Sequence, residues 1–186
     1  MRILIYLLLI VLASCTKDRI FTDDNVITPP GQDTGNIAPG VIRINEYVAK
    51  GSLLTSNLGL QSDWIELYNT LDSPIELEAG RWFITDDISE PNMFELPALS
   101  LPAHSHYVIF CEDTMIPFNN QVHTNFALSA SGDEIGLFYK RDEGFSVIDS
   151  TRFGPQTQSN KSGARIPDGS ANWNYPTEPT PGNPNQ

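Results

Sequence analysis

The run Asp63-Trp64-Ile65-Glu66-Leu67-Tyr68-Asn69 has the composition and the alternation of a β-strand. Aromatic and β-branched residues are enriched in strands, and successive side chains on a strand point to opposite faces. Trp64 and Ile65 should therefore face opposite sides of a sheet, and we expect one of the two to be exposed. A Gly/Ser-rich loop precedes the run, as is typical of a connection between strands.

Seven further short apolar runs follow the same pattern on either side of this one. They cover residues 41–48, 74–77, 81–85, 93–96, 106–110, 134–139 and 145–149. Turn-forming residues separate the runs, and no window shows a sustained helical period. About eight short strands at this spacing predict an all-β domain, either a sandwich or a barrel. Residues 140–144 have the composition of a hairpin loop between the last two strands.

The N-terminus has the features of a secretory signal. Met1-Arg2 precedes a short apolar run, and small residues precede a cysteine in Leu12-Ala13-Ser14-Cys15. The apolar run is shorter than the ~20 residues that a membrane-spanning helix needs. The last four residues resemble the lipobox of bacterial lipoproteins, which implies cleavage before Cys15 and acylation of that residue. The alternative is an ordinary signal peptide with an accidental cysteine.

The chain is thus expected to have three parts: a signal peptide at 1–14, a lipidated cysteine and tether at 15–40, and one folded domain at 41–186. Two or three acyl chains hold a protein on a membrane. The tether is polar, acidic and rich in Pro and Gly, so it cannot bury enough apolar surface to order itself. Lys17-Asp18 resembles the charged signals that send lipoproteins to the outer membrane or cell surface.

Composition limits the expected partners. The sequence carries 11 basic and 23 acidic residues, with a formal net charge of −12. Nucleic acid is not an expected partner, because phosphate backbones are bound through clustered Lys and Arg. Once Cys15 is acylated, Cys111 has no cysteine with which to form a disulfide. Its apolar neighbours predict a small buried side chain rather than a nucleophile.

The residues after Phe153 are irregular in pattern and contain the turn Pro167-Asp168-Gly169. Trp173 and Tyr175 lie in this region. Large aromatic side chains favour burial, so we expect the irregular tail to pack back on the domain.

The run at 63–69 resembles a strand of the lamin-tail domain in its bacterial branch. The other matching residues, in order, are 44–46, Trp82, 85–87, Phe94, 101–102, 126–135, Ser162, 165–169, Trp173 and 179–183. The resemblance covers about 43 to 184 and implies an immunoglobulin-like β-sandwich that binds or scaffolds, with no cofactor. Two positions depart from the pattern. Ala164 and His104 stand where glycine is usual, and both departures are expected to lie in turns.

Glu46 and Glu66 lie within apolar strand sequence, and Arg165 lies beside a turn. A guanidinium can bind a carboxylate with two parallel hydrogen bonds. We therefore expect a structural ion pair that joins Arg165 in the tail to Glu66 or Glu46. The competing hypothesis is a hydrolase that uses the paired carboxylates as acid and base.

Two weaker metal patterns are present. Asp86, Asp87 and Glu90 form an acidic loop that offers oxygen ligands for Ca²⁺ but lacks a calcium-loop motif; a solvated loop is the simpler interpretation. His104 and His106 share a strand face, and His123 is a third candidate ligand. The simpler interpretation places the first two, exposed, at a turn and a strand start. We predict no metal.

Three tryptophans, Trp64, Trp82 and Trp173, offer a platform on which sugars stack. Trp82 and Trp173 are better explained as core or tail anchors, which leaves Trp64 and Tyr68 as the candidate ligand surface. No nucleophile, phosphate-loop or zinc motif occurs in the sequence. We therefore expect a non-catalytic lipoprotein that binds a protein partner; the alternative is a carbohydrate-binding accessory lipoprotein.

Overall fold

The computed structural model describes residues 37–114 and 120–186. The predicted signal peptide, Cys15 and most of the predicted tether lie outside these residues. Residues 37–40, which were predicted to belong to the tether, contact the domain instead. Ile37 packs against the core, and the Gly40 amide donates a hydrogen bond to the Ile148 carbonyl at 2.7 Å.

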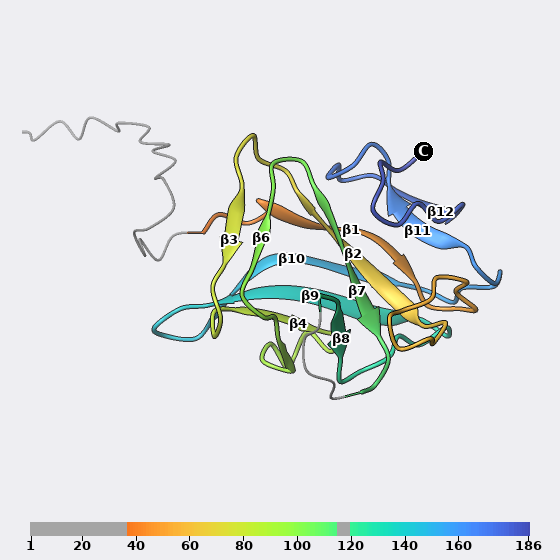
Figure 1. Ribbon diagram of the computed structural model, residues 1–186, viewed down its shortest axis with the longest axis horizontal. Helices are drawn as coiled ribbons and strands as arrows, with labels where there is room; N and C mark the ends of the chain where they lie inside the picture. The colour runs from red at the N-terminus through yellow and green to blue at the C-terminus, as the bar shows by residue number, and fades with distance from the viewer. Residues whose placement is uncertain (1–36, 115–119) are drawn as a thin grey trace, which may run out of the picture.

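Two sheets pack face to face, and a small two-stranded sheet lies at one end (Figure 1). The larger sheet contains, in order across it, β12 (Trp173–Thr177), β11 (Ser162–Arg165), β1 (Ile42–Val48), β2 (Asp63–Asn69), β7 (His106–Cys111) and β8 (Val122–Thr124). The smaller sheet contains β10 (Phe145–Phe153), β9 (Asp133–Lys140), β4 (Trp82–Thr85) and β5 (Phe94–Glu95). The third sheet pairs β3 (Ile75–Leu77) with β6 (Leu99–Leu101). The strand pairs are antiparallel except for β7 and β8, and no helix occurs in the described residues.

The predicted all-β, immunoglobulin-like sandwich is confirmed, and each of the eight predicted runs contains a strand. Four further strands, β6, β8, β11 and β12, escaped prediction. The first two have only three residues each. β11 is built from small residues of low strand propensity, and β12 contains Pro176. The hairpin at 140–144 is confirmed, because the Arg141 amide donates to the Gly144 carbonyl.

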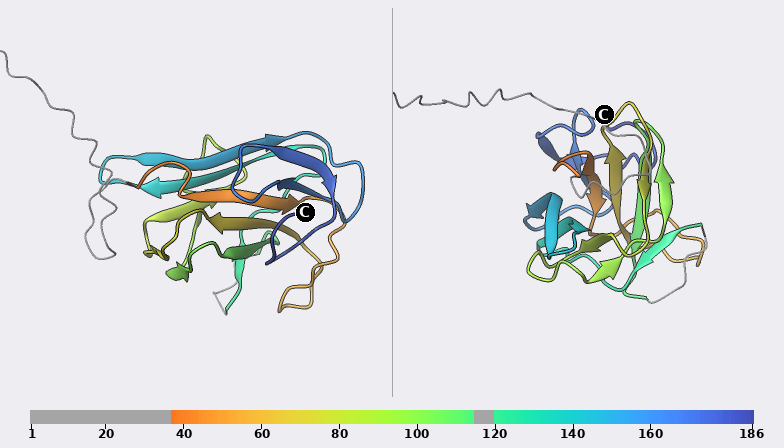
Figure 2. Two further views of the ribbon diagram at one scale, coloured as in Figure 1. Left: turned by 90° about the horizontal axis from the view of Figure 1, so that it is seen from above. Right: turned by 90° about the vertical axis from the view of Figure 1, so that its left-hand side faces the viewer.

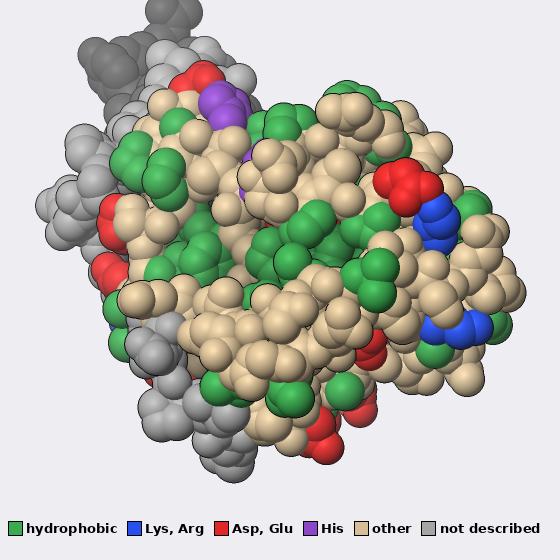
Figure 3. All heavy atoms as spheres, turned by 45° about the vertical axis from the view of Figure 1, so that its right-hand side comes forward, with side chains coloured by type: hydrophobic (Ala, Val, Ile, Leu, Met, Phe, Trp, Pro, Cys, Tyr) green, Lys and Arg blue, Asp and Glu red, His purple; other side chains and the backbone are tan. Residues whose placement is uncertain are grey.

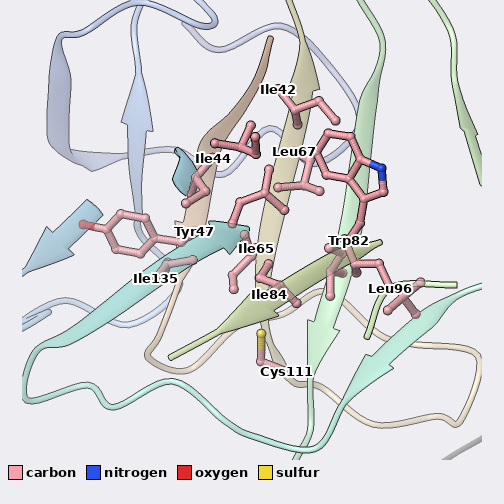
Figure 4. Close-up of a cluster of buried hydrophobic side chains, with 14 of the residues drawn as sticks. Ile42, Ile44, Tyr47, Ile65, Leu67, Trp82, Ile84, Leu96, Cys111 and Ile135 are labelled. Carbon is pink, nitrogen blue, oxygen red and sulfur yellow. The ribbon is translucent and has the colours of Figure 1, made fainter. Parts of the chain in front are cut away.

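The main core lies between the two larger sheets (Figure 4). Alternate residues of β1 and β2, including Ile44, Ile65 and Leu67, face Trp82 and Ile84 of β4 across it. Each of these side chains is buried, and burial of one such side chain contributes about 1.5–3 kcal/mol. The core thus fixes which face of each strand points outward.

A second, smaller core lies on the outer face of the larger sheet, the face turned away from the smaller sheet. Val48, Trp64 and Phe110 form it, and the half-buried Leu54 and Val108 pack against it. Trp64 and Ile65 do face opposite sides, as predicted. The expectation that one of them is exposed was wrong, since both are fully buried.

The tail was predicted to be irregular throughout, but it contains two strands. Its strands β11 and β12 extend the larger sheet beyond β1 (Figure 1). Trp173 lies 5.4 Å from the Tyr47 ring, which confirms that the tail packs back on the sandwich. Gly163 makes this possible because a Cβ there would lie 2.4 Å from the Tyr47 ring.

The two ends of the sandwich differ in what they carry (Figure 2). The described chain begins at the end that holds the 140–144 hairpin, where Arg141 Nη2 donates to the Ile37 carbonyl. The loop between β1 and β2, residues 49–62, lies at the opposite end (Figures 1 and 2). Surfaces on that loop therefore lie far from the entry point of the chain.

Candidate functional site

Glu46 and Glu66 are directly opposite each other on β1 and β2. The pleat places both on the outer face of the sheet, and both are fully buried. The last residues of the chain cross this face and cover them. The Thr180 amide and hydroxyl donate to the Glu46 carboxyl at 3.1–3.2 Å, and the Gly182 amide donates to Glu66 Oε2 at 2.6 Å.

A hydrogen-bond network ties the terminal segment to the same face. Asn45 Nδ2 donates to Glu66 Oε1 at 3.2 Å and to Asp168 Oδ1 at 2.9 Å. The Asn185 side chain donates to the carbonyls of Asn45 and Arg165. These contacts join the chain terminus to β1 and β11.

Burial sets the protonation of the carboxyl pair. It raises the pKa of Glu66 to about 8, and it also raises the pKa of Glu46, although hydrogen bonds from the terminal segment oppose both shifts. Neither carboxyl is accessible to a substrate, since both have no exposed area. The pair is therefore built as a structural contact rather than as an acid and base.

The predicted ion pair between Arg165 and Glu66 or Glu46 was wrong. Arg165 Nη2 instead lies 3.2 Å from Asp149 Oδ2 on β10. Ala164 pairs with Glu46, and neighbouring residues of a strand point to opposite faces. Arg165 therefore leaves the sheet on the side opposite to the glutamates, toward the smaller sheet.

Arg165 is fully engaged at this position. Its Nε donates to the Ile44 carbonyl at 2.8 Å, and its Nη1 donates to the Ser170 carbonyl at 2.6 Å. The Trp173 ring covers the guanidinium at 4.6 Å. Asp149 was not predicted as the partner of Arg165. The sequence signal that could have indicated it is a carboxylate within a strand rich in β-branched and aromatic residues.

The three histidines lie beside three different carboxylates. His104 lies 2.8 Å from Asp72, His106 lies 3.2 Å from Asp168, and His123 lies 2.8 Å from Glu112. His106 was predicted to be exposed, but its side chain is 8% exposed. Tyr68, half-buried, contacts the rings of His104 and His106.

No group of three or more His, Cys, Asp or Glu in residues 37–114 and 120–186 is arranged to hold a metal. Asp87 accepts hydrogen bonds from the Ser89 amide and hydroxyl, which lower the pKa of its carboxyl. Asp86, Asp87 and Glu90 are therefore not assembled into a calcium site within the described chain.

Four more predictions have a definite outcome. Cys111 is buried, as expected, and burial raises the pKa of its thiol. Trp64 and Trp82 are both fully buried, so no tryptophan platform forms and Trp64 is not a ligand surface. His104 has φ 53°, which explains why glycine is usual there. Ala164 does not lie in a turn as expected, since it is buried within β11.

The sandwich, its strand order and the sequence pattern at 63–69 can be compared with known families. A model of the Lamin Tail Domain family matches residues 36–154. The chain belongs to the lamin tail domain family. The match ends before β11, so the two tail strands and the segment over the carboxyl pair lie outside it. No curated protein gives a significant match to the sequence.

The lamin tail domain is immunoglobulin-like and non-catalytic, which is compatible with a binding or scaffold role. The geometry agrees with this. Its buried carboxyls and its thiol are closed to solvent. Neither the carboxyl pair nor the thiol is therefore open to a substrate in the described structure.

We predict a strong coupling between Arg165 and Asp149. Arg165→Ala and Asp149→Ala should each lower the free energy of unfolding by about 3 kcal/mol or more, because the first leaves the buried Asp149 with only the partly exposed Arg43 as a cation and the second leaves the buried Arg165 without a carboxylate. The double variant should lose much less than the sum. Urea unfolding of the four proteins measures this coupling.

The exposed pair Arg152–Glu134 provides the control for that cycle. Its loss should change the free energy of unfolding by under about 1 kcal/mol. Additive losses for Arg165 and Asp149, or a larger coupling of Arg165 to Glu66, would contradict the assignment.

The raised pKa of Glu66 predicts a pH-dependent stability. The folded protein holds this proton up to about pH 8, whereas the unfolded chain releases it near 4.5. The unfolded state thus binds fewer protons between these values, so stability falls as the pH rises through them, by at most about 1.4 kcal/mol per pH unit. Glu66→Gln should flatten this fall.

Urea unfolding at several pH values between 5 and 8 checks the effect. Glu143→Gln removes the same charge from an exposed loop position and should leave the slope unchanged. Equal slopes for the original protein and Glu66→Gln would rule out Glu66 as the source.

Proposed function

We propose that the protein is a membrane-anchored lipoprotein of the outer membrane or cell surface, and that its lamin tail domain binds a protein partner without catalysis. The anchor rests on the lipobox-like sequence that ends at Cys15. In the described residues, no helix is long and apolar enough to cross a membrane.

The observation that carries the binding role is a set of three exposed leucines on one loop. Leu53, Leu58 and Leu60 are 63%, 38% and 48% exposed, and all three lie in the 49–62 loop. Single exposed apolar residues are ordinary, but three large ones on one loop indicate an interaction surface. We call these three residues the leucine loop.

The surroundings of the leucine loop support this role. Figure 3, which brings forward the side that carries the loop, shows hydrophobic side chains gathered in a hollow. The half-buried Leu54 and Val108 join the loop to the second core beneath it. The leucine loop is thus held on a rigid base, which lowers the entropy lost on binding.

Its position also fits an anchored protein. The described chain starts at the opposite end of the sandwich from the leucine loop (Figure 2). A protein attached through its N-terminus would present this loop away from the attachment point. A protein partner buries such side chains at an interface.

We predict that Cys15→Ala releases the protein from the membrane fraction. The lipid supplies the membrane affinity, since the net charge of −12 repels anionic head groups. Detergent phase partitioning and mass spectrometry of the mature N-terminus check this. Cys111→Ala removes the other cysteine and should leave the partitioning unchanged. An unmodified N-terminus at another residue would contradict the anchor.

We predict that a photo-crosslinker at Leu53 captures one discrete protein in intact cells. Leu58→Ser with Leu60→Ser should lower the yield by at least about tenfold, because two buried leucines contribute several kcal/mol. Val147→Ser changes a similarly exposed residue on β10 and should have no effect. Equal capture from a crosslinker at Val147, or no effect of the leucine variants, would contradict the proposed surface.

A further inference from the structure

A groove of about 340 Å³ lies at an open edge of the sandwich. The larger sheet extends past the smaller one through β11 and β12, while β10 is the edge of the smaller sheet. The groove lies between the end of β10, the residues that follow it and strand β12. Its volume falls in the range of small-ligand sites.

Aromatic rings form its walls. Tyr47 and Phe153 stack with ring centroids 4.3 Å apart, and Trp173 lies 5.4 Å from Tyr47. Trp173 and Tyr175 of β12 both line the groove. Tyr175 is 38% exposed, and Trp173 is half-buried. The groove thus offers ring surface to a ligand.

One residue that lines the groove has a buried hydrogen-bond donor without a partner. Gln156 lines the groove and is 3% exposed. Its Oε1 accepts from the Ala49 amide at 2.8 Å, which fixes the orientation of the side chain. No described group accepts a hydrogen bond from its Nε2. An unsatisfied buried donor is costly, and a ligand oxygen would remove that cost.

The charges around the groove narrow the ligand class. Arg152 lines it while its Nε is paired with Glu134, and no carboxylate is among the lining residues. A ligand must therefore present a flat apolar face to the rings and acceptor oxygens at its rim. A pyranose ring has this form, with C–H groups on a face and hydroxyls around the edge.

Two other ligand classes fit less well. A nucleotide has a flat base, but its phosphates would be repelled by a protein of net charge −12. An extended peptide bound as an added strand needs a continuous edge of donors, and Pro176 interrupts that edge on β12.

We propose that this groove is a saccharide-binding site, in which Tyr175 and Trp173 stack on a sugar ring and Gln156 Nε2 donates to one of its oxygens. The site is separate from the leucine loop and does not depend on it. It gives the lipoprotein a second contact, to a neutral glycan.

The test is titration of the purified full chain, held in a detergent without a sugar head group. The probes are cellohexaose, xylohexaose, chitohexaose and maltohexaose, each up to about 10 mM, followed by calorimetry and tryptophan emission. Trp64 and Trp82 are fully buried, so a change in emission reports mainly on Trp173. At least one probe should bind saturably.

Tyr175→Ala should raise the Kd of that probe at least about tenfold through loss of stacking. Gln156→Glu should do the same, because it keeps the acceptor for the Ala49 amide but removes the donor. Leu53→Ser should leave the Kd unchanged, and Tyr175→Ala should leave the crosslink at the leucine loop unchanged. Thermal melts confirm that each variant is folded.

Three results would overturn the proposal. They are the absence of binding by all four probes, binding that survives both groove variants in folded protein, and saturable binding of an extended peptide or a nucleotide at the groove in place of the sugars. Loss of the leucine-loop crosslink alone would affect only the proposed protein partner.

Discussion

The buried contact between Arg165 and Asp149 holds the two sheets and the tail together. Asp149 lies on β10 of the smaller sheet and accepts hydrogen bonds from Arg43, the Ile44 amide and Arg165. Arg165 belongs to the tail strand β11 and donates to the Ile44 carbonyl. A single carboxylate on β10 thus binds two other segments of the chain, β1 and β11. Its cations offset the cost of its burial, and Trp173 closes the site above the guanidinium.

The outer face of the larger sheet is closed in a different way. Its two glutamates receive hydrogen bonds from uncharged donors of the terminal segment, without a cation. Burial therefore favours their neutral forms, which explains the direction of both pKa shifts. The terminal segment thereby joins the folded unit and covers the carboxyl pair that had suggested an acid–base mechanism, so that solvent does not reach it. What remains on the surface is suited to binding.

The two proposed contacts lie on rigid parts of this frame. The leucine loop rests on the second core around Trp64, and the aromatic groove is formed where β11 and β12 extend past β10. The groove depends on the tail, because β12 supplies Trp173 and Tyr175 and β11 positions Gly163 beneath the Tyr47 ring. The tail strands, which lie outside the family match, therefore shape the groove.

Local patterns were sufficient to predict the strands with strong period-two alternation, the 140–144 hairpin and the family. These features depend on residues that are close in the chain, such as those at 63–69. The short strands β6 and β8 lacked enough residues to show a period, and Pro176 argued against β12. The partner of Arg165, the burial of Trp64 and the groove at Gln156 depended on the tertiary structure. Each depends on which face of a strand points inward and on which distant strand lies opposite. Residues close in sequence determine neither of these.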